Sequence, residues 1–293
     1  MAGGMRGDMS ADMTAEKPGE TVRLAAIQMV STPRVNDNLK VAGELIRQAV
    51  DGGAQMVALP EYFPLIGASD AQRLAAREPL GEGPIQQWMA DLAREYGLWL
   101  FGGSIPLYAD QADKLRNTTL VFDPQGNRVA RYDKVHLFAF QQGSESYREA
   151  DTIEAGKAQA VVVHTPWARV GLSICYDLRF PELYRAMVRA GEAPDLILVP
   201  AAFTETTGQA HWEILLRARA IENQCYVLAI GQGGVHENGR CTHGNSMLID
   251  PWGTVISRLD KGAGVLLGEF CPQRIAVVRE SLPALLHHHL QEF

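Results

Sequence analysis

The chain has 293 residues, a length that suits one large α/β domain, and 46% of them are hydrophobic. Its net charge of −7 argues against partners such as nucleic acid or an anionic membrane surface, and no apolar run is long enough to cross a membrane. The four cysteines show neither metal-ligand spacing nor a disulfide pattern, and free thiols favour a reducing, cytoplasmic location.

The first 60 residues predict a short extension followed by a strand, a helix and a second strand. Residues 1–20 lack periodicity, and we expect a disordered N-terminal extension there. Strands expected over 22–30 and 56–59 flank a helix capped by Asn36 or Asp37. This order implies parallel pairing of the two strands with a right-handed crossover.

The rest of the chain mixes strands with further helices. Turn signals at 123–127 and 251–253 each join two strands into an antiparallel hairpin. These elements predict one layered α/β domain over 21–283, followed by a tail over 284–293. Strands are expected at 98–105, 115–122, 128–134, 161–163, 169–174, 196–199, 224–231, 246–250, 254–259 and 264–270, and helices from Pro84, from Pro181, and over 211–222 and 272–280.

The segment 170–182 places a cysteine where a strand turns into a helix. Residues 170–174 have the pattern of a buried strand, and Pro181 suits the first position of a helix. Cys175 is therefore expected near backbone N–H groups and the positive end of a helix, which lower a thiol pKa and form an oxyanion site. The alternative is a buried structural cysteine.

Two charged residues follow other strands in the same way. Glu61 comes after the strand at 56–59, and Lys134 ends the strand at 128–134. One charged residue after a strand is usually only the start of a loop. Ligands of α/β sheets bind outside the carboxyl ends of strands, so a base, a cation and a thiol in three such places indicate a nucleophilic site.

These residues lie in three segments that resemble the signature blocks of the nitrilase superfamily of carbon–nitrogen hydrolases. The segments are 59–61, 132–138 and 173–182, in the family's order and at its usual separation. Residues 208–213 and 217–227 resemble the Nit-type branch of this superfamily. The resemblance runs from about Val22 to about Leu282. It implies a four-layer α-β-β-α sandwich with mixed sheets and an enzyme without metal or organic cofactor.

The resemblance and the chemistry together assign four catalytic roles. Cys175 is the candidate nucleophile, and Glu61 is the candidate general base. Lys134 and the backbone N–H of Tyr176 are expected to stabilise the oxyanion. Glu149 matches the family's second glutamate, which holds the lysine and the substrate amide.

Substrate contacts are expected around the same turn and near residue 203. Arg179 is the candidate for binding a carboxylate, because a guanidinium can form two parallel hydrogen bonds with it. The alternative, which we favour from the sequence, is that Arg179 holds the turn through Asp177 or Glu182. The candidate substrate-binding residues are Tyr176, Arg179, Phe203, Thr204 and His211.

The sequence therefore predicts a cytoplasmic amidase that hydrolyses a small carboxylate-bearing amide through a cysteine thioester. Residues 220–222 and 224–227 are more similar to deaminated-glutathione amidases, which serve metabolite repair, than to ω-amidases acting on 2-oxoglutaramate or succinamate. The alternatives are an inactive scaffold, which would have lost the cysteine, lysine or first glutamate, and a papain-like hydrolase, which needs a Cys–His pair.

The helix from Pro181 predicts a homodimer or an assembly of dimers. Leu183 and Met187 form one apolar stripe, and Tyr184 and Val188 lie beside it. A helix that packs on a sheet needs only one stripe, so Tyr184 and Val188 are expected at or near a two-fold interface. The resemblance agrees, since relatives pair through the helix that follows the cysteine.

Overall fold

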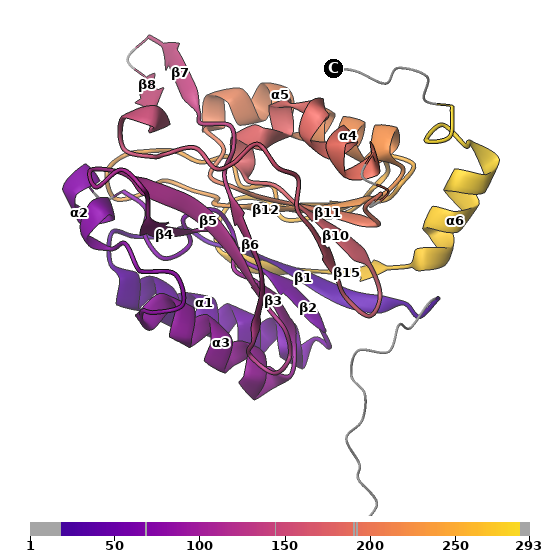
Figure 1. Ribbon diagram of the computed structural model, residues 1–293, viewed down its shortest axis with the longest axis horizontal. Helices are drawn as coiled ribbons and strands as arrows, with labels where there is room; N and C mark the ends of the chain where they lie inside the picture. The colour runs from indigo at the N-terminus through magenta and orange to yellow at the C-terminus, as the bar shows by residue number, and fades with distance from the viewer. Residues whose placement is uncertain (1–18, 68, 144, 190, 192, 288–293) are drawn as a thin grey trace, which may run out of the picture.

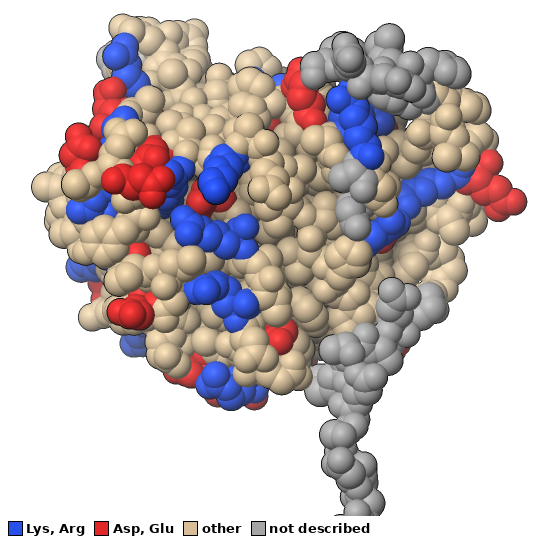
Figure 2. Space-filling model, in the orientation of Figure 1, with Lys and Arg blue, Asp and Glu red and all other residues tan. Residues whose placement is uncertain are grey.

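The computed structural model describes residues 19–67, 69–143, 145–189, 191 and 193–287. Nearly all of the predicted N-terminal extension lies outside the described residues, as does the end of the predicted tail. Within the described part of the chain, no helix is both long and apolar enough to cross a membrane. Lys and Arg are interspersed with Asp and Glu on the face seen in Figure 2.

Two β-sheets face each other between two layers of helices (Figure 1). Helices α1 (Val35–Asp51) and α3 (Pro84–Tyr96) cover the outer face of the first sheet. Helices α4 (Pro181–Arg189) and α5 (Glu205–Asn223) cover the outer face of the second sheet. This arrangement confirms the predicted four-layer α-β-β-α sandwich.

The first sheet has the strand order β15-β1-β2-β3-β5-β4, and β6 pairs with β5. Strands β1, β2 and β3 are parallel, as the strand–helix–strand order predicts, whereas β15 runs antiparallel to β1. The predicted hairpin of β5 and β6 is confirmed. The bounds are β1 Val22–Gln28, β2 Met56–Ala58, β3 Trp99–Phe101, β4 Ile105–Tyr108, β5 Leu115–Phe122, β6 Arg128–Asp133 and β15 Gly264–Phe270.

The second sheet has the strand order β14-β13-β12-β11-β10-β9, with β10, β11 and β12 parallel. The predicted hairpin of β13 and β14 is also confirmed. Its bounds are β9 Val162–His164, β10 Arg169–Leu172, β11 Leu196–Ala201, β12 Tyr226–Gly231, β13 Met247–Ile249 and β14 Val255–Arg258. The other elements are α2 Asp70–Ala75, β7 Ala139–Gln142, β8 Glu145–Arg148, α6 Pro272–Ser281 and two 3₁₀ helices, η1 Glu149–Asp151 and η2 Cys175–Arg179.

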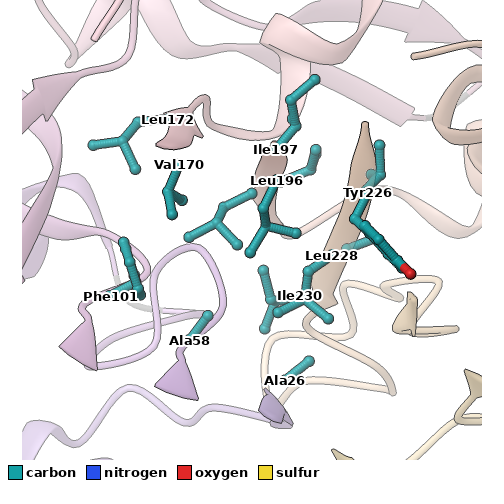
Figure 3. Packing of buried hydrophobic residues seen from close by; sticks show 14 of the residues in the cluster. Ala26, Ala58, Phe101, Val170, Leu172, Leu196, Ile197, Tyr226, Leu228 and Ile230 are labelled. Atoms are coloured by element: carbon teal, nitrogen blue, oxygen red, sulfur yellow. The ribbon is translucent and has the colours of Figure 1, made fainter. Parts of the chain in front are cut away.

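The main hydrophobic core lies between the two sheets (Figure 3). Ala26 and Ala58 of the first sheet face Leu228 and Ile230 of the second, so small side chains on one side accommodate large ones on the other. Every residue of β11 and β12 is buried, because each strand is covered by the first sheet on one face and by helices on the other. The active-site residues are anchored to this rigid centre.

The single strand predicted over 98–105 is wrong. Strand β3 ends at Phe101, and β4 begins at Ile105. The two strands lie on opposite sides of β5 in the sheet. Gly103 has a φ of +51°, and a Cβ atom there would lie 2.1 Å from the carbonyl oxygen of Pro60. Glycine adopts this positive φ without strain and is the only residue that permits so close an approach, so the chain after Phe101 packs against the segment that leads into Glu61.

Two helix starts also differ from the sequence expectation. Helix α1 begins at Val35 without a side-chain cap, and neither Asn36 nor Asp37 caps it. Helix α5 begins at Glu205, six residues before the predicted start, because the side chain of Thr204 accepts a hydrogen bond from the first turn. The segment 138–156, which has no clear period, forms the β7–β8 hairpin and η1.

The structure contradicts the predicted interface role of Tyr184. Its side chain is completely buried, and its hydroxyl donates to Ser173 Oγ at 3.1 Å. The guanidinium of Arg219 in α5 lies 5.5 Å from the centre of its ring. Tyr184 therefore packs inside the chain between α4 and α5, while Val188 remains half-buried. The homodimer itself stays a prediction.

Candidate active site

Cys175 lies at a sharp turn directly after β10. Its φ is +48°, a left-handed conformation that residues other than glycine rarely adopt. On the strand side, Ser173 Oγ donates to the carbonyl of Leu198 in β11 at 2.8 Å. On the helix side, η2 runs from Cys175 to Arg179 and α4 begins at Pro181. The turn holds a backbone conformation that costs about 1–3 kcal/mol, and its surroundings must stabilise it.

Buried Asp177 supplies much of that stabilisation. Its carboxylate accepts hydrogen bonds from Ile174 N at 2.9 Å, Tyr132 Oη at 2.7 Å and His136 N at 3.1 Å. These contacts tie the turn to the end of β6 in the other sheet. Arg179 has no ion pair with Asp177 or Glu182 among the described contacts, so the favoured prediction that it holds the turn through one of them is wrong.

Lys134 lies between two carboxylates. Its Nζ is 2.8 Å from Glu61 Oε1, 2.8 Å from Glu149 Oε2 and 2.9 Å from Glu149 Oε1. The side chains of Lys134 and Glu61 are 0% and 1% exposed, respectively. Desolvation of three charges is expensive, and only complete hydrogen bonding can offset it. The three residues that the sequence placed after separate strands or in an irregular segment therefore form one charged cluster.

Both oxygens of Glu61 are held in place. Oε1 also accepts from Asn117 Nδ2 at 2.9 Å, and Oε2 accepts from the backbone N–H of Ala202 at 2.8 Å. Asn117 belongs to β5 of the first sheet, whereas Ala202 follows β11 of the second. Sequence reasoning missed both residues, because neither stands beside a motif and only the packing of the two sheets brings them to Glu61.

Glu149 is held by groups from two further segments. Tyr62 Oη donates to its Oε1 at 2.7 Å, and the backbone N–H of Phe138 donates to its Oε2 at 2.7 Å. Tyr62 itself has a φ of +55°, a second strained position directly after Glu61. The β7–β8 hairpin, which projects from the sandwich in Figure 1, leads into Glu149.

The electrostatics of the cluster favour a neutral thiol and a charged lysine. Burial raises the pKa of the Cys175 thiol, and the charge of Glu61 raises it further, although Lys134 opposes both. The expectation of a lowered thiol pKa is therefore wrong, because burial and the charges of Glu61 and Glu149 outweigh the opposing charge of Lys134. Burial lowers the pKa of Lys134, but Glu149 and Glu61 together keep it well above its usual value. Burial raises and Lys134 lowers the pKa of Glu149, with a net decrease.

A narrow cavity opens over the cluster. Tyr176, Phe203 and Thr204 line it as predicted, and Thr204 is also the cap of α5. Arg179 and His211 are not among the described lining residues. The Arg179 guanidinium lies 5.4 Å from the centre of the Phe203 ring and contacts His211 Nδ1 at 3.4 Å. The described lining consists of Glu61, Phe138, Glu149, Cys175, Tyr176, Ala202, Phe203, Thr204, Thr207 and Arg240.

The lining includes residues that the sequence did not predict. Arg240 comes from the turn-rich segment between β12 and β13, in which no strand or helix pattern marks a functional residue. Thr207 lies in the first turn of α5, before the helix start that the sequence predicts. Among the described residues, no group of three or more His, Cys, Asp or Glu side chains could hold a metal ion. The expected absence of a cofactor stays a prediction.

In this four-layer sandwich a thiol and two carboxylates line one narrow cavity, and an ammonium group lies between the carboxylates. The nitrilase resemblance implies this arrangement for a carbon–nitrogen hydrolase. Residues 23–280 match the family model described as carbon-nitrogen hydrolase. The chain belongs to the carbon–nitrogen hydrolase family, and the resemblance seen in its three signature segments is confirmed. The protein is accordingly a hydrolase of carbon–nitrogen bonds.

Individual relatives extend this assignment. A deaminated glutathione amidase from Synechocystis sp. is 41% identical over 266 residues, which cover 90% of this chain and 96% of that protein. Omega-amidase NIT2-A from Xenopus laevis is 37% identical over 263 residues, which cover 89% and 92%, respectively. The crystal structure of the C. elegans NitFhit protein superposes with a TM-score of 0.84 at 35% identity, covering 94% of this chain and 66% of that longer one.

Proposed function

We propose that the protein is an amidase that hydrolyses deaminated glutathione, a tripeptide-like amide with a carboxylate at each end. The observation that carries the proposal is that Glu61 and Cys175 line the same narrow cavity, while Lys134 Nζ contacts Glu61 Oε1 at 2.8 Å. The 41% identity to a deaminated glutathione amidase supports the substrate. The reaction yields 2-oxoglutarate and cysteinylglycine.

The first half of the proposed reaction forms a thioester. Glu61 takes the proton of the neutral Cys175 thiol as the sulfur attacks the amide carbon. The developing oxyanion is stabilised by Lys134 and by the backbone N–H of Tyr176. The carbon–nitrogen bond then breaks, and the proton on Glu61 passes to the departing amine. The acyl group stays on the sulfur as a thioester.

The second half hydrolyses that thioester. Glu61 takes a proton from water, and the oxygen attacks the thioester carbon. The carbon–sulfur bond breaks, the carboxylic acid leaves, and the proton returns to the thiolate. Glu149 is proposed as a positioning residue, because its two oxygens lie within 2.9 Å of Lys134 Nζ and hold the ammonium group toward the cavity.

The second candidate is an ω-amidase acting on 2-oxoglutaramate or succinamate, in which the amine that leaves is ammonia. The 37% identity to an omega-amidase supports it, and the chemistry at Cys175 would be the same. An inactive scaffold of the same fold has no support here, since the cysteine, the lysine and both glutamates are all present. A cytoplasmic location stays a prediction for either enzyme.

The test is a hydrolysis assay on deaminated glutathione, 2-oxoglutaramate and succinamate. We expect the highest kcat/KM on deaminated glutathione, and no turnover by Cys175→Ala. Intact-protein mass spectrometry after a brief substrate pulse should find one acyl group, which peptide mapping assigns to Cys175. Appreciable hydrolysis by Cys175→Ala would contradict the nucleophile, and a clear preference for 2-oxoglutaramate would favour the second candidate.

A further inference from the structure

A second hollow joins the narrow cavity at Arg240. The second hollow is the larger of the two, and Arg240 is among the described lining residues of both. We call the larger one the Arg240 groove. A substrate longer than a simple amide must extend beyond the narrow cavity, and the groove is the neighbouring hollow that shares Arg240 with it. Its described lining consists of Tyr62, Leu65, Ile66, Gly67, Arg73, Ser146, Tyr147, Asn238, Gly239, Arg240 and Cys241.

The lining of the Arg240 groove is basic. It contains two arginines, and none of the described lining residues is aspartate or glutamate. Arg73 is already paired with Asp70 outside the groove. Arg240 forms no ion pair with a carboxylate among the described contacts, so its charge remains available. In a protein whose net charge is −7, such a local cation selects for an anionic ligand.

Arg240 has unused hydrogen-bonding capacity. Its Nη2 donates to the carbonyl of Ala202 at 2.8 Å, and its guanidinium lies 5.3 Å from the centre of the Tyr147 ring. Its Nε is buried and has no hydrogen-bond partner in the described structure. A buried N–H without a partner is costly, and a carboxylate is the ligand that best matches a guanidinium edge.

The loop that carries Arg240 is braced rather than free. The buried ring of His236 contacts the carbonyl of Ser31 through Nδ1 and Thr242 Oγ1 through Nε2, each at 2.8 Å. The backbone N–H of Arg240 donates to Asn238 Oδ1 at 3.1 Å. A guanidinium on a braced loop loses little conformational entropy when a ligand binds, so it can discriminate between ligands.

We propose that the Arg240 groove is the subsite for the departing amine, and that Arg240 binds the carboxylate of a peptide-like leaving group. The inference rests on the proposed function. It separates the two candidates chemically, since cysteinylglycine ends in a carboxylate whereas ammonia has no group that could reach the groove. Arg179 contacts a different set of residues, Tyr176, Phe203 and His211, and is not among the described lining residues of either hollow, so it is no alternative to Arg240 for this carboxylate.

The test compares three substrates with the same acyl group: deaminated glutathione, its C-terminal amide and 2-oxoglutaramate. Arg240→Gln should lower kcat/KM for deaminated glutathione about 10–100-fold, mainly through KM, and change the other two little. Arg240→Lys should recover part of the loss. The control is Arg47→Gln, which removes an exposed arginine of α1 that pairs with Asp51.

An equal loss on all three substrates would overturn the proposal, because it would show that Arg240 acts through Ala202 and Glu61 instead. No loss on any substrate would overturn it as well. If the wild-type enzyme hydrolyses none of the three, the proposed function fails, and calorimetry with cysteinylglycine still decides the subsite. Wild type should then bind cysteinylglycine more tightly than Arg240→Gln does, and equal binding would refute the role of Arg240.

Discussion

Lys134 carries its charge in the buried interior, and the two glutamates make this possible. Each carboxylate lies 2.8 Å from the ammonium group, and the backbone and side-chain donors on Glu61 and Glu149 occupy their remaining oxygens. Loss of one partner would leave uncompensated charge in a dry site, which typically costs 3–5 kcal/mol. The cluster should therefore respond to mutation as a unit.

We expect Glu61→Gln and Lys134→Met each to remove nearly all activity. The double variant should be little worse than either single one, because both residues serve the same steps at Cys175. The measurement is kcat/KM for the two singles and the double, with circular dichroism to verify folding. Strict additivity of the two losses in free energy would show that the residues act independently.

The raised pKa of Cys175 predicts how the alkylation rate of its thiol depends on pH. Because burial and Glu61 disfavour the thiolate, its fraction should be small at neutral pH and increase about tenfold per pH unit. The rate of alkylation by iodoacetamide should then rise from about pH 6 to about pH 9 without a plateau. The Cys175→Ala variant corrects for the other three thiols. A plateau near pH 6 would indicate a resting thiolate instead.

At the scale of elements, the break between β3 and β4 positions the base. Gly102 and Gly103 let the chain leave β3 and re-enter the sheet beyond β5, and Gly103 packs against the backbone of Pro60. Ser104 Oγ, directly after the break, accepts from the N–H of Tyr62 at 3.0 Å. Gly103 and Ser104 therefore hold the residues on either side of Glu61, although neither takes part in the proposed reaction.

Gly103→Ala should both destabilise the protein and reduce its activity. The added Cβ would lie 2.1 Å from the Pro60 carbonyl oxygen, so the backbone beside Glu61 must move, at a cost of at least about 2 kcal/mol. Gly97→Ala is the matched control, since Gly97 also has a positive φ but a Cβ there meets nothing within 4 Å. It should cost only about 1 kcal/mol. Urea unfolding of both variants measures the difference, and equal destabilisation would contradict the steric argument.

At the scale of the whole molecule, the site forms where the two sheets meet. Glu61 and Lys134 follow β2 and β6 of the first sheet, whereas Cys175 follows β10 of the second. The sheets are locked together by the core in Figure 3, so the thiol and its base keep their geometry without a dedicated linker. We accordingly propose residues 21–283 as one catalytic domain.

Because Tyr184 is inside the chain, we place the interface of the predicted homodimer on the outer surface of the α4–α5 layer instead. Ile221 of α5 is 50% exposed, and Val188 of α4 is half-buried. We expect Val188→Asp with Ile221→Asp to yield monomers in light scattering, since two charges would be buried at the interface. The control is Val41→Asp on α1, which covers the other sheet. A double variant that stays dimeric would place the interface elsewhere.

The sequence by itself determined most of the strands, the two predicted hairpins, most helix ends and three of the four residues in the charged cluster. These features depend on local properties that can be read from the sequence alone: the hydrophobic period, the turn residues and the spacing of motifs. Glu149 lies in a segment without a period, and its assignment came only from the family resemblance.

Tertiary structure alone decided the rest. Periodicity could not reveal that Tyr184 is enclosed by α5, that Asn117 and Ala202 hold Glu61, or that Arg240 reaches the cavity. Each depends on contacts between residues at least 30 positions apart. The thiol pKa was mispredicted for the same reason. A helix start is visible in the sequence, whereas desolvation and the two carboxylates arise only when both sheets close over Cys175.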